Sequence, residues 1–167
     1  MNTINIVIGP AGCGKSTYIK KMAKPEDVII SSDDIREEIY GNSEIQGNPR
    51  LIFTIFHGRI AQALVEGKNV WADATNIDVR SRKDYFAYGK GNNIVGHIIP
   101  ISINECKKQN LSRDRQVPEY VIDRMYKNIV MPTIEEHFSK IIVAYRDKNS
   151  YKTFPYINGF SYIDLVK

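Results

Sequence analysis

Residues 9–17, which we call the phosphate loop, read GPAGCGKST and match the spacing G-x-x-x-x-G-K-[ST]. Glycines let the backbone turn tightly and aim its N–H groups inward, so these donors and the start of the next helix can cradle phosphate oxygens. Lys15 can reach the β- and γ-phosphates of a nucleotide, and the Ser16 hydroxyl can ligate Mg²⁺. The pattern predicts a site for Mg²⁺ with ATP or another nucleoside triphosphate. The residues expected to bind it are Gly9, Ala11, Gly12, Cys13, Gly14, Lys15, Ser16 and Thr17.

Two aspartates come directly after apolar runs further along the chain. Asp33 follows residues 28–30, and Asp73 ends residues 69–73. A kinase needs a carboxylate that accepts or orients the proton of the acceptor hydroxyl, and Asp33 is the candidate for this general base. Asp73 is the candidate for a carboxylate linked to Mg²⁺. The alternative for Asp33 is a helix cap, and Asp34 is interpreted as a solvated acid in the first turn of a helix.

Polar residues beside these aspartates are candidates for binding the acceptor. Arg36 lies one helical turn after Asp33, so it can hold a phosphate of the acceptor or brace a carboxylate. Thr75 and Asn76 follow Asp73 and have short polar side chains that can contact the acceptor. Turn chemistry is an equal alternative for Thr75 and Asn76, because such residues often fix loops through local hydrogen bonds.

Arg113 and Arg115 lie in a short polar loop between two expected helices. Phosphoryl transfer spreads negative charge over the moving group, and a mobile loop that carries arginine can neutralise it. A closing loop also excludes water from the reaction. We therefore predict a short helical lid at about residues 107–118, with Arg113 as a catalytic residue. The alternative is an ordinary solvated run of charges.

The elements that must position these residues alternate between strand and helix. Ligands of such folds bind at the carboxyl ends of parallel strands, where the phosphate loop, Asp33 and Asp73 all fall. The pattern predicts an α/β fold with a five-stranded, mainly parallel sheet covered by helices on both faces. The expected strands are 4–8, 28–30 (buried on both faces), 69–73, 94–101 and 141–145, and the expected helices are 15–24, 31–40, 51–66, 79–88, 104–112, 118–129 and 132–138.

Composition favours one globular domain over residues 1–167. The chain is 43% hydrophobic and 25% charged, and its net charge of +4 suits anionic partners. No apolar run approaches the roughly 20 residues needed to span a bilayer, and the start of the chain shows no secretion signal. We therefore expect a cytoplasmic protein without a membrane partner.

Several other residues receive structural interpretations. The two cysteines are expected to be reduced thiols, although Cys13 at a helix N-terminus is expected to be sensitive to oxidation. His57 is interpreted as structural, and Arg80 and Arg82 as the solvated start of a helix. The aromatic tail, residues 151–167, suits either packing across the surface or contact between copies, so both a monomer and a homo-oligomer stay open.

Taken together, the motifs resemble the 5′-hydroxyl polynucleotide kinases of the P-loop kinase superfamily, in particular the kinase domain of a bacteriophage end-healing enzyme. The resemblance covers roughly the first 130 residues. It implies a P-loop kinase fold. The motifs that carry it are the phosphate loop, Ser32-Asp33-Asp34-Ile35-Arg36, Asp73-Ala74-Thr75-Asn76, and Arg113 before Val117-Pro118 and a helix with Ile122, Met125 and Tyr126.

The resemblance also implies roles for individual residues. Asp33 matches the general base, Arg36 an arginine near the acceptor's phosphate, and Arg113 the lid arginine at the transferred phosphate. The segment Asp73-Ala74-Thr75-Asn76 matches a region near the acceptor nucleotide, so Asp73 is also a candidate for binding the acceptor. A second lid arginine is common upstream, where this chain has Lys107-Lys108-Gln109, so the alternatives are that this nucleotide contact is missing or that Lys108 or Arg115 supplies it. The resembling phage enzyme has a further phosphatase domain, and we do not expect removal of 3′-phosphate from this chain.

The sequence therefore predicts an ATP-dependent kinase that phosphorylates the 5′-hydroxyl ends of RNA or DNA, as in the repair of nucleic acid ends. Both polymers fit the motifs. A first alternative is a kinase of the same fold that acts on a small-molecule hydroxyl in a nucleoside, sugar, antibiotic or nucleotide sugar. A second alternative is a nucleotide-binding ATPase module that transfers phosphate to water.

Overall fold

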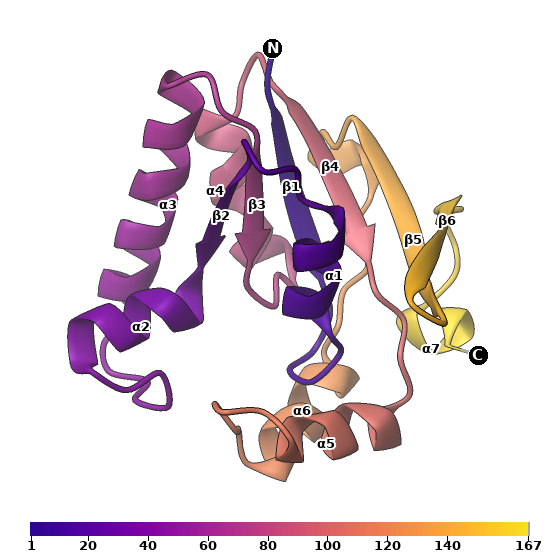
Figure 1. The fold of residues 1–167 in the computed structure, drawn as a ribbon. Coiled ribbons are helices and arrows are strands. Elements are labelled where there is room, and N and C mark those ends of the chain that lie inside the picture. Colours follow the sequence, from indigo (N-terminus) through magenta and orange to yellow (C-terminus); the bar gives the residue numbers. More distant parts are fainter. Residues whose placement is uncertain (167) are drawn as a thin grey trace.

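The computed structural model of the protein describes residues 1–166. Within them, the strands form one six-stranded sheet in the order β2-β3-β1-β4-β5-β6, with helices packed on both faces (Figure 1). The strands β1 to β5 run parallel to one another, and β6 pairs with β5 in the antiparallel direction. The expected α/β fold is confirmed, with one more strand than the sequence predicted. The strands are β1 (Thr3–Ile8), β2 (Val28–Ser31), β3 (Val70–Asp73), β4 (Asn93–Ile98), β5 (Lys140–Asp147) and β6 (Ser150–Pro155).

The helices begin and end at residues that cap their free backbone groups. Asn48 caps the longest helix by accepting hydrogen bonds from the Arg50 and Leu51 amides, and Asp78 caps α4 by accepting a hydrogen bond from the Ser81 amide. The helical elements are α1 (Lys15–Met22), α2 (Ser32–Tyr40), α3 (Pro49–Val65), α4 (Val79–Tyr88), α5 (Ile103–Leu111), α6 (Glu119–Lys127), the 3₁₀ turn η1 (Ile134–Glu136) and α7 (Tyr162–Leu165).

Alternating side chains of the central strand feed two hydrophobic cores, one on each face of the sheet. Ile4 and Ile6 of β1 join a core with α3, α4 and α7, whereas Val7 joins a core with α1, α5 and α6. Successive strand side chains point to opposite faces, so both faces of β1 are covered. This packing fixes the position of the strand from which the phosphate loop emerges.

β2 corrects one expectation, because it is an edge strand. It pairs with β3 alone among the described elements, and Ile29 is 43% exposed while Ile30 is buried. The apolar run 28–30 was expected to be buried on both faces. A short apolar run looks the same at an edge and in the centre, because its position depends on which strands pair.

The aromatic tail completes the fold over its described residues, 151–166. β6 pairs with β5, and buried Tyr162 of α7 donates a hydrogen bond to the Ile99 carbonyl next to β4. Tyr145 of β5 donates to the Leu165 carbonyl at 2.6 Å. Of the two expectations for the tail, packing across the surface is the one confirmed. No helix in residues 1–166 is long and apolar enough to cross a membrane.

Candidate active site

The phosphate loop turns sharply between β1 and α1. Gly12 and Gly14 have φ angles of +82° and +91°, a conformation that favours glycine. A Cβ atom at Gly12 would also collide with the Cys106 carbonyl of α5, so α5 packs directly on the loop. The loop residues that the sequence singled out therefore form one tight turn at the N-terminus of α1, where backbone N–H groups and the helix dipole attract anions.

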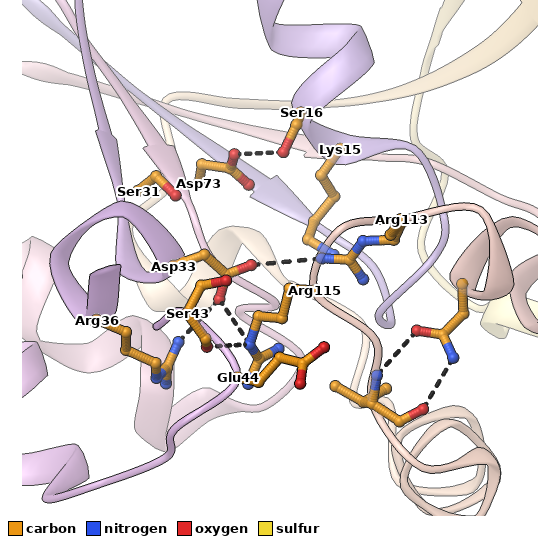
Figure 2. A network of polar contacts seen from close by, with 12 residues as sticks. Lys15, Ser16, Ser31, Asp33, Arg36, Ser43, Glu44, Asp73, Arg113 and Arg115 are labelled. Atoms are coloured by element: carbon orange, nitrogen blue, oxygen red, sulfur yellow. Dashed lines mark hydrogen bonds and ion pairs between the residues drawn. The ribbon is translucent and has the colours of Figure 1, made fainter. Parts of the chain in front are cut away.

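Side chains of the phosphate loop meet Asp73 at the end of β3. The Ser16 hydroxyl donates a hydrogen bond to Asp73 Oδ2 at 2.7 Å, and Lys15 Nζ donates to the Pro10 carbonyl at 2.9 Å (Figure 2). Burial raises the pKa of the Asp73 carboxyl above its ordinary value, while Lys15 and the Ser16 hydrogen bond lower it in part. The structure thus brings together the residues expected at the phosphates and at the metal.

The pair Ser16 and Asp73 fits a magnesium ion held mainly through a nucleotide. Both offer hard oxygen ligands in direct contact with each other, and Mg²⁺ usually takes one or two protein oxygens and completes its shell with water and phosphate. Within the described part of the chain, no group of three or more His, Cys, Asp or Glu side chains could hold a metal by itself. The donor set is therefore that of a metal bound together with a nucleotide.

Asp33 lies at the start of α2, and its carboxylate does not cap this helix. The residue that caps α2 is Ser31, whose hydroxyl accepts a hydrogen bond from the Asp34 amide at 3.3 Å. Ser31 also ends β2, which pairs with Asp73 of β3 in register. The helix-cap interpretation of Asp33 is wrong for this reason, and its side chain is available for chemistry.

An arginine cluster, Arg36, Arg113 and Arg115, surrounds Asp33. Arg36 Nη1 donates to Asp33 Oδ1 at 3.0 Å, and Arg113 Nη2 donates to Oδ2 at 3.3 Å. Arg115 Nε lies 3.3 Å from Oδ1. Figure 2 shows these guanidinium groups around the carboxylate. The solvated charge run that was the alternative for Arg113 and Arg115 is therefore wrong.

The arginine cluster has more positive charge than Asp33 can neutralise, and part of its hydrogen-bonding capacity is unused. The Arg36 residue is 7% exposed and its guanidinium lies 6.0 Å from the centre of the Phe53 ring. Arg36 Nε and Arg113 Nη1 are buried and have no hydrogen-bond partner among residues 1–166. Buried donors without partners are costly, so the site suits an anion that would pair with them.

The arginines of the lid are presented by a short loop, residues 112–118, which we call the lid loop. Its base is closed by Asn110, whose amide donates to the Val117 carbonyl at 2.8 Å and accepts from the Val117 N–H at 3.0 Å. Arg115 Nε also donates to the Ser43 carbonyl at 2.7 Å. Burial lowers the pKa of Arg115, although Asp33 and Glu44 counteract part of this shift.

Asn76 is a correction to the residues expected to bind the acceptor. It is 3% exposed, and its amide donates to the Val7 and Ala74 carbonyls while it accepts from the Tyr85 hydroxyl. Its side chain is thus fully engaged inside the protein and fixes the loop after β3. Thr75 is half-buried, and its carbonyl accepts a hydrogen bond from the Gly9 amide at 3.1 Å, so its contact with an acceptor stays a prediction.

Two other expectations are wrong because burial overrides local sequence. Arg82, expected to be solvated, is fully buried and pairs with Glu136 at 2.9 Å while donating to the Asn76 carbonyl. Cys13, expected to be sensitive to oxidation, is buried, and this burial raises the pKa of its thiol. A raised pKa keeps the thiol protonated and unreactive.

A cavity of about 480 Å³ adjoins the phosphate loop on the side away from Asp33's arginines, where α5 and the β5–β6 hairpin meet the loop. Apart from the phosphate-loop residues Cys13, Gly14 and Thr17, the sequence did not single out its walls, because they come from segments far apart in the chain. Tyr151 of β6 lines it and packs edge-on against Tyr18 of α1, with ring centres 4.8 Å apart. The other lining residues include Gly14, Thr17, Glu105, Gln109, Arg146, Asp147 and Lys152.

A phosphate loop after β1, with acidic residues at the ends of β2 and β3, defines a P-loop nucleotide-binding protein. The chain belongs to the AAA domain family, whose model matches residues 4–132. A protein of Acanthamoeba polyphaga mimivirus, named as a bifunctional polynucleotide phosphatase/kinase, is 32% identical over 158 residues. The match covers 86% of this chain and 34% of that protein, so the chain spans about a third of this relative's length.

Solved structures share the fold at low identity. A chain in the Pnkp1/Rnl/Hen1 RNA repair complex has a TM-score of 0.68 and 18% identity over 96% of this chain and 51% of its own length. A gluconokinase from Sinorhizobium meliloti 1021 has a TM-score of 0.58 and 15% identity over 86% of this chain and 82% of its own length. These likenesses support the P-loop kinase fold and leave the acceptor to be argued from the site.

Proposed function

We propose that the protein is an ATP-dependent kinase that transfers the γ-phosphate to the 5′-hydroxyl end of RNA or DNA. The observation that carries this proposal is the arginine cluster around Asp33, placed beside a phosphate loop. A kinase for an uncharged hydroxyl compound needs a base and a phosphate loop, but it does not need buried guanidinium groups with unused donors on the acceptor side. A nucleic acid end supplies both a hydroxyl and a neighbouring phosphodiester.

In the proposed reaction, Asp33 accepts the proton of the 5′-hydroxyl as the hydroxyl oxygen attacks the γ-phosphorus, the bond from this phosphorus to the bridging oxygen breaks, and ADP leaves. Lys15 binds the β- and γ-phosphates, and Arg113 moves from Asp33 to the transferred group, where negative charge spreads in the transition state. Arg36 stays near Asp33 and binds the first phosphate of the acceptor. Ser16 and Asp73 would hold Mg²⁺, which neutralises phosphate charge when it is bound.

The nucleoside of ATP is assigned to the cavity beside the phosphate loop. Gly14 and Thr17 belong to the loop and also line the cavity, so a nucleotide with its phosphates on the loop directs its base toward Tyr151. An aromatic ring stacks on any purine, so this wall accepts ATP or another nucleoside triphosphate. The donor and acceptor sides of the site are then separate, with Asp33 between the reacting groups.

The mimivirus protein's printed name supports a polynucleotide acceptor, and its 32% identity covers most of this chain. The similarity to a gluconokinase keeps a small-molecule hydroxyl as the second candidate, because the fold is common to both. Between the two, surplus positive charge around Asp33 favours an acceptor that carries phosphate. An ATPase module is disfavoured, because water as acceptor carries no phosphate for Arg36 to bind.

The test is transfer of labelled γ-phosphate from ATP to matched RNA and DNA oligonucleotides with 5′-hydroxyl ends. Nucleosides, nucleoside 3′-phosphates, gluconate and a reaction without acceptor are run in parallel. Label on the oligonucleotide ends supports the proposal and ranks RNA against DNA. Label on gluconate or a nucleoside alone assigns a small-molecule acceptor, and release of free phosphate at an equal rate with and without acceptor assigns an ATPase.

A further inference from the structure

The two arginines of the lid loop have different surroundings, although both contact Asp33. The side chain of Arg113 is 31% exposed, its contact with Asp33 is 3.3 Å long, and its Nη1 is buried without a hydrogen-bond partner among residues 1–166. The side chain of Arg115 is only 11% exposed, and its Nε donates to the Ser43 carbonyl at 2.7 Å. Arg113 is therefore loosely held, whereas Arg115 is held between two other segments.

The segment that Arg115 contacts is itself well fixed. We call residues 41–48, which join α2 to α3, the acceptor-side loop, because Figure 2 shows Ser43 across Asp33 from Ser16 of the phosphate loop. The Ser43 amide donates to Glu37 of α2 at 2.9 Å. The Ser43 carbonyl is therefore presented by a loop that α2 already supports, and Arg115 reaches it from 72 residues further along the chain.

The lid loop does not need Arg115 to hold its own shape. Its base is closed by the paired hydrogen bonds between Asn110 and Val117, and Asn110 is 4% exposed. The contacts of Arg115 therefore act between the lid loop and the acceptor-side loop. Both contacts are made by Arg115 Nε, which donates to the Ser43 carbonyl and lies 3.3 Å from Asp33 Oδ1. A planar guanidinium fixes the direction of this N–H, which a lysine ammonium does less well.

We propose that Arg115 is a positioning residue that clasps the lid loop to the acceptor-side loop, so that both close as one unit over the acceptor side of Asp33. This proposal rests on the proposed function. Arg113 alone then moves to the transferred phosphate. Moving Arg115 would break its contacts with Ser43 and Asp33 and remove the donor from the part-buried Ser43 carbonyl, whereas Arg113 has a free donor and gains a partner by moving.

In this proposal Arg113 binds the transferred phosphate and Arg115 joins the two loops, which replaces the expectation that Arg115 contacts the nucleotide. It also assigns the acceptor-side loop a role, as the wall that holds a nucleic acid end against Asp33. Loss of the clasp then weakens the hold on the acceptor and leaves the phosphate loop, the metal ligands and the cavity beside them unchanged. A change in KM for the oligonucleotide therefore indicates a clasp, whereas a change in KM for ATP indicates a nucleotide contact.

The test measures KM for ATP, KM for a 5′-hydroxyl oligonucleotide and kcat in R115A, R115K and R113A, with R124A as a control that removes an exposed arginine of α6. For R115A we expect the oligonucleotide KM to rise about tenfold and the ATP KM to change less than about twofold, with R115K between R115A and the unaltered protein. R113A is expected to lower kcat instead. A rise in ATP KM with unchanged oligonucleotide KM in R115A would overturn the clasp.

A second measurement does not depend on activity. Hydrogen exchange of the amides in residues 41–48 is expected to be about tenfold faster in R115A than in the unaltered protein, R113A or R124A. Unchanged exchange in R115A overturns the clasp. If the unaltered protein labels no oligonucleotide, the proposed function fails, and the exchange result still decides whether Arg115 joins the two loops.

Discussion

At the scale of single residues, Asp33 is the side chain on which the proposed chemistry depends. Its carboxylate is ringed by the arginine cluster and is not used as a helix cap. We predict that Asp33→Asn lowers kcat by about 10² to 10⁴-fold, because the amide cannot accept the hydroxyl proton. Binding of a fluorescent ATP analogue is expected to be unchanged within about twofold, since Asp33 is not a ligand of the phosphates. Near-normal turnover in this variant would remove Asp33 from the role of base.

Asp73 gives a prediction about pH, because burial raises the pKa of its carboxyl in the folded protein. Between the unfolded pKa and the raised folded pKa of this carboxyl, the folded protein binds more protons than the unfolded chain. As pH rises through this range, the residue therefore lowers the stability of the folded protein. Asp73→Asn is therefore expected to raise the Tm of the nucleotide-free protein at pH 7, which lies above the unfolded pKa of the carboxyl. The measurement is thermal unfolding of both proteins between pH 4 and pH 7, in which the Tm difference should shrink toward acid pH.

The same substitution should weaken use of the metal. The amide lacks the charge that a magnesium ligand needs, so we expect the Mg²⁺ concentration for half-maximal activity to rise about 10- to 100-fold or more. Asp34→Asn is the matched control, because Asp34 lies in the first turn of α2 and its backbone amide meets the cap residue Ser31. An unchanged Mg²⁺ requirement in Asp73→Asn would take Asp73 out of the metal site.

At the scale of elements, Arg82 ties α4 to the segment before β5. It is fully buried, pairs with Glu136 through two nitrogens at 2.9 and 3.2 Å, and holds the Asn76 carbonyl. We predict that Arg82→Ala lowers the free energy of unfolding by about 3–5 kcal/mol, because it removes a fully buried guanidinium and leaves the partly buried Glu136 carboxylate without its charged partner. Arg80→Ala, an exposed neighbour on the same helix, should stay within about 0.5 kcal/mol. Denaturant unfolding of both variants checks this, and equal stabilities would contradict it.

The β5–β6 hairpin supplies the second prediction at this scale. Tyr151 of β6 lines the cavity beside the phosphate loop and packs on Tyr18. Tyr151→Ala is expected to weaken nucleotide binding by about tenfold, since stacking of a base on an aromatic ring is worth about 1–3 kcal/mol. Tyr151→Phe keeps the ring and should bind normally, and titration with a fluorescent nucleotide measures both. Normal affinity in Tyr151→Ala would place the base elsewhere.

How far the sequence could predict these elements depends on the range of the contacts. The strand, glycine loop and helix of residues 4–22 follow from local pattern, and so do the aspartates at the ends of two strands. The pair between Arg82 and Glu136 joins residues 54 apart, and the edge position of β2 depends on which strands pair. Neither the ion pair nor the edge position leaves a signal in the local sequence. The expectations of a solvated Arg82 and of a run 28–30 buried on both faces are wrong for this reason.

At the scale of the whole molecule, the fold gathers the site at one edge of the sheet. Parallel order places the ends of β1, β2 and β3 together, and Figure 1 shows α2, α5 and α6 beside that edge. The phosphate loop, Asp33 and Asp73 converge there as the sequence predicted. The contact between the lid loop and the acceptor-side loop depends on the backbone carbonyl of Ser43. Every residue has such a carbonyl, so the sequence could not predict which one Arg115 would contact.

The positive net charge of the chain predicts that salt weakens the binding of a polymer acceptor. The chain has a net charge of +4, and the arginine cluster adds local positive charge where a nucleic acid end is proposed to bind. A polymer that places about three phosphates on the protein should lose affinity with a log–log salt slope of about −2, or roughly 10- to 20-fold between 50 and 200 mM salt. A nucleoside 3′-phosphate brings one phosphate group and should lose far less. The measurement is KM for both acceptors across this salt range at fixed Mg·ATP. Equal salt dependence for the two would mean that the protein binds only the terminal nucleotide, and would favour a small-molecule acceptor over a polymer.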